Sequence, residues 1–260
     1  MSKMQKLALV TGASRGIGRA IALTLAQDGY SIKVHYNRNK EKAEEVVQEI
    51  KKKGVDAYSV QADLTKPNEI EEMFEKIAKH TDTIDLLVNN AAMDHMKMIE
   101  DYPNEEIKEV IDTNLTGTII VTKLALPFLK KSKNASIISI ASRMGGPKTI
   151  ATIGAYGPSK AGVIKFTQCC ALEFAKYKIR ANCVAPGLTN TDMIHEAFLL
   201  ETDGDESKVK DIMEDMAKKN PSGRVGEPQD IANVVSFLAS NKASYINGET
   251  IGVNGGSILV

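Results

Sequence analysis

Residues 7–18 of the chain are Leu7-Ala8-Leu9-Val10-Thr11-Gly12-Ala13-Ser14-Arg15-Gly16-Ile17-Gly18. The apolar residues predict a buried strand, and the glycines predict a turn that leads directly into a helix. Glycines in such a turn let the backbone approach a pyrophosphate closely, and the helix N-terminus offers free N–H groups to the phosphate. Glycine spacing alone is common in loops, but its position between a first strand and a helix indicates a dinucleotide site. The residues expected to contact the dinucleotide here are Gly12, Ser14, Arg15, Gly16, Ile17 and Gly18.

Strands and helices are expected to alternate along the rest of the chain. Short β-branched runs bounded by Gly, Asn or Asp predict strands at 7–11, 31–36, 57–61, 86–89, 136–139, 180–185 and 249–253. Helices are expected near 15–29, 40–53, 67–79, 105–131, 155–176 and 229–240. This alternation predicts an α/β fold: a Rossmann-type, doubly wound, seven-stranded parallel sheet with helices on both faces.

One segment interrupts the alternation. Residues 195–221 have a helical pattern around an acidic cluster of Asp203, Asp205 and Glu206. Long excursions of this kind in α/β enzymes are often mobile lids. We therefore expect one NAD(P)-binding domain over 1–260, with a helical substrate lid at about 190–222. The alternative interpretation is a solvated insertion without a function of its own.

Composition excludes several classes of protein. Lys plus Arg and Asp plus Glu both number 33, so the net charge is zero and the bulk basicity of a nucleic-acid binder is missing. The chain contains no apolar run long enough to span a bilayer. Residues 1–10 hold only four consecutive apolar residues before Thr11, which predicts no secretory signal and a cytoplasmic location.

The three cysteines do not predict a metal site or a disulfide framework. Their number is odd and no C-x-x-C spacing occurs, so no metal ligand set is expected. The interpretation adopted is that Cys169, Cys170 and Cys183 are small, buried apolar residues.

The end of the second expected strand predicts which dinucleotide binds. An NAD site usually has an acidic residue there to bind the ribose 2′-hydroxyl. This strand instead ends at Tyr36 and is followed by Asn37 and Arg38, while Arg15 lies in the glycine turn. Two guanidinium groups suit a 2′-phosphate, so NADPH is predicted over NADH, with Asn37 and Arg38 at the site. The alternative is that Arg38 is a solvated loop residue.

Two further cofactor contacts follow from sheet topology, because ligands of such sheets lie beyond the carboxyl ends of the strands. Asp63 and Leu64 follow the third strand, where the Asp63 carboxylate is expected to accept a hydrogen bond from the adenine amino group. Asn90 and Ala91 follow the fourth strand, where small residues permit close approach to the ribose.

Four residues are candidates for the chemistry. Tyr156 and Lys160 are four apart, which stacks them on one helix face, and a nearby ammonium is expected to lower the tyrosine pKa from about 10. Tyr156 then becomes a usable general acid–base. Ser142 follows the fifth strand, where its hydroxyl is placed to hydrogen-bond the substrate oxygen. Asn114 lies within the long helix expected at 105–131, where an inward amide is suited to hold a water that connects Lys160 to solvent.

These residues occur within longer matching motifs. The chain resembles the short-chain dehydrogenase/reductase family from about Lys6 to Gly256, through TGASRGIG at 11–18, NNAA at 89–92, YGPSK at 156–160 and APGLTNTDM at 185–193. The resemblance implies a tetrad of Asn114, Ser142, Tyr156 and Lys160, and hydride transfer between nicotinamide and a carbonyl carbon. It also implies cofactor contacts by Tyr156, Lys160, Pro186, Gly187 and Thr189.

Within that family the chain is most similar to 3-oxoacyl-acyl-carrier-protein reductases, on VTGASRGIGRAIA at 10–22 and GRVGEPQDIANVVSFLAS at 223–240. That resemblance implies NADPH as cofactor, a homotetramer, and docking of an acidic carrier protein on basic residues. Lysines at 130, 131, 133, 176 and 178, together with Arg180, form two clusters that would flank one active-site mouth if they dock such a carrier. The favoured interpretation is that they are ordinary solvated charges.

Three hypotheses of function remain open at this point. The first is an NADPH-dependent reductase of 3-oxoacyl thioesters. The second is an NAD(P)-dependent dehydrogenase of a small polyol, sugar or steroid, since the segment at 190–222 is longer than in ordinary fatty-acid reductases. The third is a cofactor-binding sensor without catalysis. Residues 93–98, M-D-H-M-K-M, are expected to edge the substrate pocket with an adaptable apolar wall, His95 being a partly exposed loop residue.

Overall fold

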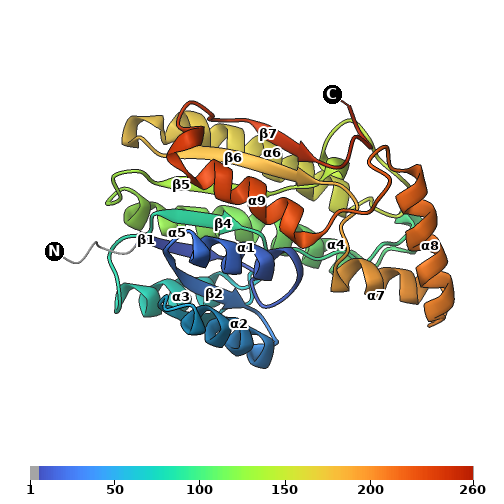
Figure 1. The fold of residues 1–260 in the computed structure, drawn as a ribbon, viewed down its shortest axis with the longest axis horizontal. Helices are drawn as coiled ribbons and strands as arrows, with labels where there is room; N and C mark the ends of the chain where they lie inside the picture. The colour runs from blue at the N-terminus through green and yellow to red at the C-terminus, as the bar shows by residue number, and fades with distance from the viewer. Residues whose placement is uncertain (1–5, 260) are drawn as a thin grey trace.

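The computed structural model describes residues 6–259 and contains a seven-stranded parallel sheet in the order β3-β2-β1-β4-β5-β6-β7 (Figure 1). The N-terminal residues on which the expectation about a signal segment partly rests lie outside the described residues. The strands are β1 (Lys6–Val10), β2 (Tyr30–Tyr36), β3 (Ala57–Gln61), β4 (Leu86–Asn89), β5 (Ser136–Ile140), β6 (Arg180–Pro186) and β7 (Thr250–Val253). The strand order reverses beside β1, which creates the crevice at which such sheets bind ligands. The predicted sheet is confirmed.

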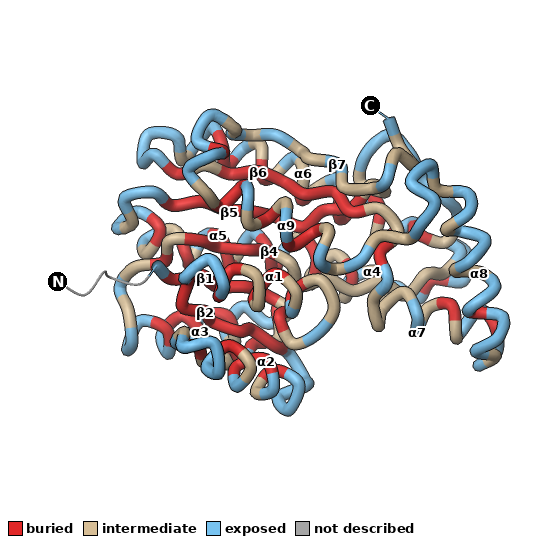
Figure 2. Tube along the Cα trace, viewed as in Figure 1, coloured by how far each residue is buried: buried red, intermediate tan, exposed pale blue. Residues whose placement is uncertain are grey.

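Helices cover both faces of this sheet, as expected. Apolar side chains of α1 (Gly16–Gln27), α2 (Lys40–Lys52) and α9 (Pro228–Ala239) pack in one core cluster. Those of α3 (Pro67–Ala78), α5 (Gly117–Leu129) and α6 (Tyr156–Glu173) pack in the other. Figure 2 shows the strands buried between these two layers. Burial on both faces explains why the central strands are almost entirely apolar.

Local sequence accounts for the individual helices. In α2 the buried residues Ala43, Val46, Val47 and Ile50 recur at helical spacing and face the sheet. Asn39 caps the helix by accepting a hydrogen bond from the Lys42 backbone N–H. The positive charges of the lysines in the last turn interact favourably with the negative end of the helix dipole and stabilise the helix.

The single helix expected at 105–131 is wrong in one respect. The structure has α4 (Asn104–Ile111), a π-helical turn (Asp112–Thr116) and then α5. Within that turn Asn114 is 1% exposed and its amide bonds to groups outside the helix. A π-turn inserts an extra residue into the helix, and such turns are frequent at functional sites. The inward amide therefore belongs to a local distortion that hydrophobic periodicity does not reveal.

The segment after β6 leaves the sheet as α7 (Asp192–Glu201) and α8 (Glu206–Lys219), at the edge where the strands end (Figure 1). Phe198 of α7 and Val209 of α8 are buried. The acidic cluster has local roles in this segment: Asp205 caps α8 by accepting hydrogen bonds from Ser207 and Lys208 N–H groups. This two-helix segment is called the lid below.

One expectation about the cysteines is wrong. Cys170 and Cys183 are buried, but Cys169 is exposed. Neighbouring residues on a helix point about 100° apart, so the buried face of α6 includes Cys170 and excludes its neighbour. Within residues 6–259, no helix has the length and apolar character needed to cross a bilayer.

Candidate active site

The glycine turn is packed tightly between β1, α1 and the segment after β4. Gly12 has a φ of +62°, and a Cβ there would lie 2.8 Å from the Cα of Ala91. A Cβ on Gly18 would overlap the Gly12 carbonyl oxygen and lie 2.5 Å from Nδ2 of Asn90. These two glycines are therefore required for the turn to pack as it does.

The N-terminus of α1 fits a phosphate. Its N-cap residue is Arg15, whose side chain carries no acceptor and makes no cap hydrogen bond. The first-turn N–H groups of Gly16 and Ile17 consequently receive no side-chain cap, and the helix dipole is positive at this end. These are the features that bind the phosphates of dinucleotides.

Asn90 holds the glycine turn in place. Its Nδ2 donates to the carbonyl oxygens of Thr11 at 2.9 Å and Gly12 at 3.0 Å. The Thr11 hydroxyl oxygen in turn accepts hydrogen bonds from the N–H groups of Asn90 and Ala91. The amide donors of the Asn90 side chain thus order the glycine turn. A ribose would contact the residues around Asn90 and not these donors.

His35 is a second residue that orders the turn, and the sequence analysis missed it. Its Nδ1 accepts a hydrogen bond from the Gly12 N–H at 3.0 Å, and its Nε2 lies 3.1 Å from the Ala62 carbonyl oxygen. Burial lowers the pKa of His35 to about 4, so the ring is neutral and its proton is on Nε2. The signal in the sequence is a histidine in the last two residues of a strand whose carboxyl end lies beside the glycine turn.

Polar residues predicted for the adenosine end lie beyond β2 and β3. Burial acts to raise the pKa of Asp63, but hydrogen bonds from Thr65 and the charges of Lys66 and Arg38 outweigh it and leave that pKa below its usual value. The Arg38 side chain is 84% exposed, with Nη2 3.9 Å from Oε1 of Glu109. The carbonyl oxygen of Asn37 accepts from Gln61, while Leu64 is buried in the core. Arg38 is free to turn toward a bound anion.

The candidate catalytic residues Ser142, Tyr156 and Lys160 lie where β5 and α6 come together. Tyr156 is the first residue of α6, and Ser142 caps the short helix after β5 with its Oγ accepting the Met144 N–H at 3.1 Å. Lys160 is 2% exposed, and its Nζ donates to the Ile140 carbonyl oxygen at 2.9 Å. The Lys160 Nζ lies 5.6 Å from the centre of the Tyr156 ring. The predicted group of Ser142, Tyr156 and Lys160 is therefore brought together.

The electrostatics of this group differ from the expectation. Burial raises the pKa of Tyr156 to about 12, with hydrogen bonding to Ser142 acting in the opposite direction and the charge of Asp94 adding to the rise. The expected lowering by Lys160 is not found, with the lysine Nζ 5.6 Å from the centre of the Tyr156 ring. Burial also lowers the pKa of Lys160 itself, to about 8. With a pKa of about 12 the Tyr156 hydroxyl is protonated near neutral pH.

Asn114 has a positioning role in the structure. Its Oδ1 accepts the Met93 N–H at 2.8 Å, and its Nδ2 donates to the Met93 carbonyl oxygen at 2.9 Å and to Ser159 Oγ at 3.1 Å. The amide thus joins the segment after β4 to α6. The same segment carries His95, which is partly buried with Nε2 3.2 Å from Oε2 of Glu109.

The segment after β6 lies beside the glycine turn. The Gly187 N–H donates to the Val253 carbonyl oxygen, and Pro186 ends β6. Thr189 is buried with its hydroxyl donating to the Gly187 carbonyl oxygen at 3.1 Å. Thr191 caps α7 and lies against Gly16 of the glycine turn, where a glycine Cβ would be 3.6 Å from its methyl carbon. Thr191 is thus a cofactor-side residue that the sequence analysis did not select.

The two basic clusters do not flank the active-site mouth, the less favoured of the two interpretations of these residues. Residues that precede β5 and β6 lie at the amino ends of these strands, whereas Ser142 follows the carboxyl end of β5. The clusters do meet, with Nζ of Lys130 4.0 Å and Nζ of Lys176 5.1 Å from the centre of the Tyr177 ring. Because parallel strands place their carboxyl ends at one edge, these lysines lie at the opposite edge from the active-site mouth of the same chain.

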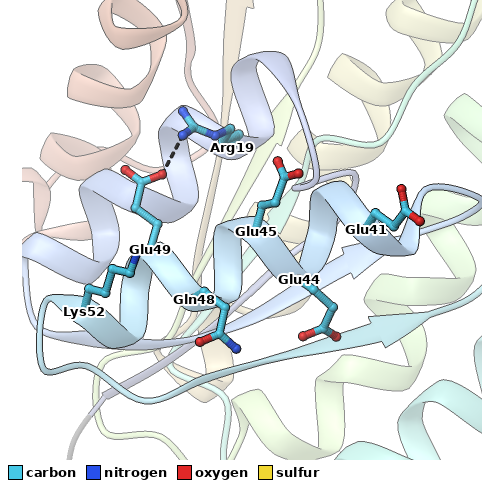
Figure 3. A pocket seen from close by; sticks show the side chains of 7 residues that line it. All are labelled: Arg19, Glu41, Glu44, Glu45, Gln48, Glu49 and Lys52. Atoms are coloured by element: carbon cyan, nitrogen blue, oxygen red, sulfur yellow. Dashed lines mark hydrogen bonds and ion pairs between the residues drawn. The ribbon is translucent and has the colours of Figure 1, made fainter.

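A separate surface groove runs between α1 and α2 (Figure 3). Glu49 pairs with Arg19 at 2.5 Å there, and other glutamates extend into solvent. None of the residues selected for cofactor or substrate lines it. The groove is lined by Arg19, Glu41, Glu44, Glu45, Gln48, Glu49 and Lys52.

Over residues 6–259, no group of three His, Cys, Asp or Glu side chains is arranged to hold a metal ion.

Comparison with known families agrees with this geometry. The model of the short chain dehydrogenase family matches residues 6–201, which include the glycine turn, Asn114, Ser142, Tyr156 and Lys160. The chain belongs to the short-chain dehydrogenase family. It is an NAD(P)H-dependent oxidoreductase that acts on a CH–OH or C=O group.

Relatives of this short-chain dehydrogenase include well-matched reductases. It is 42% identical to the 3-oxoacyl-acyl-carrier-protein reductase FabG of Staphylococcus aureus, over 99% of this chain and all of that one. It is 36% identical to versicolorin reductase stcU of Emericella nidulans, over 97% and 95% of the two chains. A short chain dehydrogenase from Burkholderia cenocepacia, solved in complex with NADP, has a TM-score of 0.86 at 30% identity, over 96% and 97% of the two chains.

Proposed function

We propose that this short-chain dehydrogenase is an NADPH-dependent carbonyl reductase that converts a 3-oxoacyl thioester into the 3-hydroxyacyl product. The observation that carries the proposal is the meeting of Ser142, Tyr156 and Lys160 beside the glycine turn. The 42% identity to FabG of Staphylococcus aureus over full length supports the substrate class. We further propose that the chain is one domain, with the lid over the substrate.

In this proposal the cofactor lies along the carboxyl edge of the sheet. The residues proposed to contact the cofactor are Gly12, Ser14, Arg15, Gly16, Ile17, Gly18, Asn37, Arg38, Asp63, Leu64, Asn90, Ala91, Tyr156, Lys160, Pro186, Gly187 and Thr189. NADPH when bound supplies a hydride for the carbonyl carbon. The preference for NADPH over NADH is inferred from Arg15 and Arg38 and from the missing carboxylate after β2.

The side chains handle the proton and the oxygen. Tyr156 donates its hydroxyl proton to the carbonyl oxygen as that oxygen gains negative charge, and the Ser142 hydroxyl donates a hydrogen bond to the same oxygen. The phenol, whose pKa is about 12, is fully protonated near neutral pH. Lys160, with a pKa of about 8, then returns a proton to Tyr156. Hydride and proton together convert the ketone into a hydroxyl group.

A second candidate function is a dehydrogenase of a small polyol or sugar. Asp94 favours it, because this carboxylate acts on both Tyr156 and Lys160 through its charge. A carboxylate so placed suits a substrate rich in hydroxyl groups better than an apolar acyl chain. The rate of NADPH oxidation with acetoacetyl-CoA, compared with a panel of sugars and ketosteroids, separates the two. Acetoacetyl-CoA is expected to be the best substrate, and turnover of sugars or steroids alone would reject the first function.

Partners and assembly are part of the same proposal. The acyl group arrives on coenzyme A or on an acyl carrier protein, and the enzyme is a cytoplasmic homotetramer. The outer face of α5 supports the proposed assembly into a tetramer. Ile119 on this face is 38% exposed, and some of the residues beside it are apolar. Light scattering of the purified protein is expected to give the mass of four chains; the mass of one chain would refute the assembly.

A further inference from the structure

Ion pairs attach α7 of the lid to the cofactor side of the sheet. Nη1 of Arg15 lies 2.5 Å from Oε1 of Glu196 and 3.9 Å from Oδ2 of Asp192. Nζ of Lys42 lies 3.3 Å from the same Oδ2. Two cations from separate elements, one at the start of α1 and one in the first turn of α2, therefore converge on carboxylates of the lid.

The position of these cations identifies the ligand chemistry they suit. Arg15 begins the helix whose N-terminus fits a phosphate, and Lys42 lies in the first turn after β2. The ribose of the adenosine half lies between these two elements in doubly wound dinucleotide sites. Since both cations already reach one carboxylate oxygen, they are close enough together to share the oxygens of a single phosphate.

We propose that Lys42 joins Arg15 in binding the 2′-phosphate of NADP(H), and that Asp192 and Glu196 are internal counter-ions that this phosphate displaces. The inference rests on the proposed NADPH site and adds Lys42 of α2 and the two α7 carboxylates to the groups that determine its specificity. NAD(H) carries an uncharged 2′-hydroxyl at this position, so it leaves the carboxylates paired with Arg15 and Lys42. The lid is then attached at α7 when NAD(H) is bound and released there when NADP(H) is bound.

The energetics permit this exchange. The four side chains are 44% to 59% exposed, and each exposed ion pair changes an equilibrium constant by only about 1.4- to 5-fold. A phosphate carries more charge and makes stronger charge-assisted hydrogen bonds than a carboxylate. Displacing the carboxylates reduces NADP(H) affinity without abolishing it. From the pair energies, removing both carboxylates is expected to tighten NADP⁺ binding about three- to tenfold.

The first experiment measures the dissociation constants of NADP⁺ and NAD⁺ by titration calorimetry. The Asp192→Asn/Glu196→Gln variant is compared with the wild type and with Glu201→Gln, which changes an exposed glutamate at the far end of α7. The double variant is expected to bind NADP⁺ more tightly and NAD⁺ unchanged, while Glu201→Gln alters neither. Equal changes for both cofactors, or no change for NADP⁺, would overturn the proposal.

The second experiment tests the two cations. Arg15→Gln and Lys42→Gln are each expected to weaken NADP⁺ binding and leave NAD⁺ binding nearly unchanged. If Arg15→Gln has no selective effect on NADP⁺, the proposed NADPH site is wrong and this inference falls with it. If Arg15→Gln acts selectively but Lys42→Gln and the double lid variant do not, the NADPH site stands and only this inference is overturned.

Hydrogen exchange provides a readout that a purely structural ion-pair cluster would not change. At saturation with either cofactor, contacts common to both are equally protected. Amides of α7 are therefore expected to exchange faster with NADP⁺ than with NAD⁺ in the wild type, and equally fast in the double variant. Equal exchange with both cofactors in the wild type would contradict the displacement.

Discussion

The Gly12 N–H donates a hydrogen bond to Nδ1 of His35 at 3.0 Å, so a buried imidazole holds the turn at which the cofactor is expected to bind. Nε2 of the same ring lies 3.1 Å from the Ala62 carbonyl oxygen beyond β3. One neutral side chain thus links the carboxyl ends of β1, β2 and β3. Because its pKa is lowered to about 4, this link also makes the stability of the protein dependent on pH.

Acid is expected to destabilise the protein through His35. The unfolded chain binds a proton at this histidine below a pKa of about 6.5, whereas the folded chain does so only near 4. Stability is therefore lost as pH falls from 6.5 to 4, by about 3 kcal/mol from this residue. Urea unfolding at several pH values is expected to show a weaker pH dependence in His35→Gln. The exposed His80→Gln is the control and should retain the wild-type dependence; a similar dependence in His35→Gln would contradict the assignment.

Replacing Asn114 is expected to reduce the free energy of unfolding. Asn114→Ala leaves both the N–H and the carbonyl oxygen of Met93 without their partner in a partly buried segment. Each such group costs about 1–3 kcal/mol, so the free energy of unfolding should fall by about 2–6 kcal/mol. Urea unfolding measures this loss, and Asn134→Ala at an exposed position is the matched control. A variant as stable as the control would show that the Met93 contacts are dispensable.

Removing the charge of Asp94 is expected to shift the pH profile toward acid. The Asp94 carboxylate raises the pKa of both Tyr156 and Lys160, so Asp94→Asn lowers both values. In the oxidation direction the phenolate is the base, and the rate should rise at a lower pH than in the wild type. In the reduction direction the rate should fall at a lower pH. A profile unchanged or moved to higher pH would refute the influence of Asp94 on this pair.

Gly18→Ala is expected to damage the cofactor site. The added Cβ would overlap the Gly12 carbonyl oxygen and lie 2.5 Å from Nδ2 of Asn90. Overpacking of this kind typically costs about 1–3 kcal/mol, and here it also displaces the turn. Calorimetric titration with NADP⁺ should show much weaker binding, with the secondary structure retained by circular dichroism. Wild-type affinity would show that the turn tolerates a side chain.

Much of the fold was predictable because its determinants are local. The strands are short segments rich in apolar residues. Gly12 stands between β1 and α1, and Gly16 and Gly18 lie in the first turn of α1. The π-turn around Asn114 was not predictable, because it replaces one helical hydrogen-bond pattern by another within a continuous apolar periodicity. The exposure of Cys169 also depends on the rotation of α6 about its axis, which its composition does not define.

The site was predictable where motifs place the residues and not where distant segments meet. Ser142, Tyr156 and Lys160 lie within one stretch of sequence and are brought together as expected. His35, by contrast, acts through Gly12 and Ala62, which belong to other elements. The pairing of Arg15 with Glu196 joins residues 181 positions apart, so no local pattern reveals it. The same holds for Thr191 against Gly16.

The role of Tyr156 as proton donor is tested most directly by the rate of NADPH oxidation with acetoacetyl-CoA in Tyr156→Phe. Loss of the hydroxyl removes general acid catalysis, which contributes about 10²–10⁴-fold. The account predicts a fall in kcat of at least that order with NADPH affinity nearly unchanged, while Tyr177→Phe, at the opposite edge of the sheet, retains wild-type turnover. Wild-type turnover in Tyr156→Phe would contradict the account.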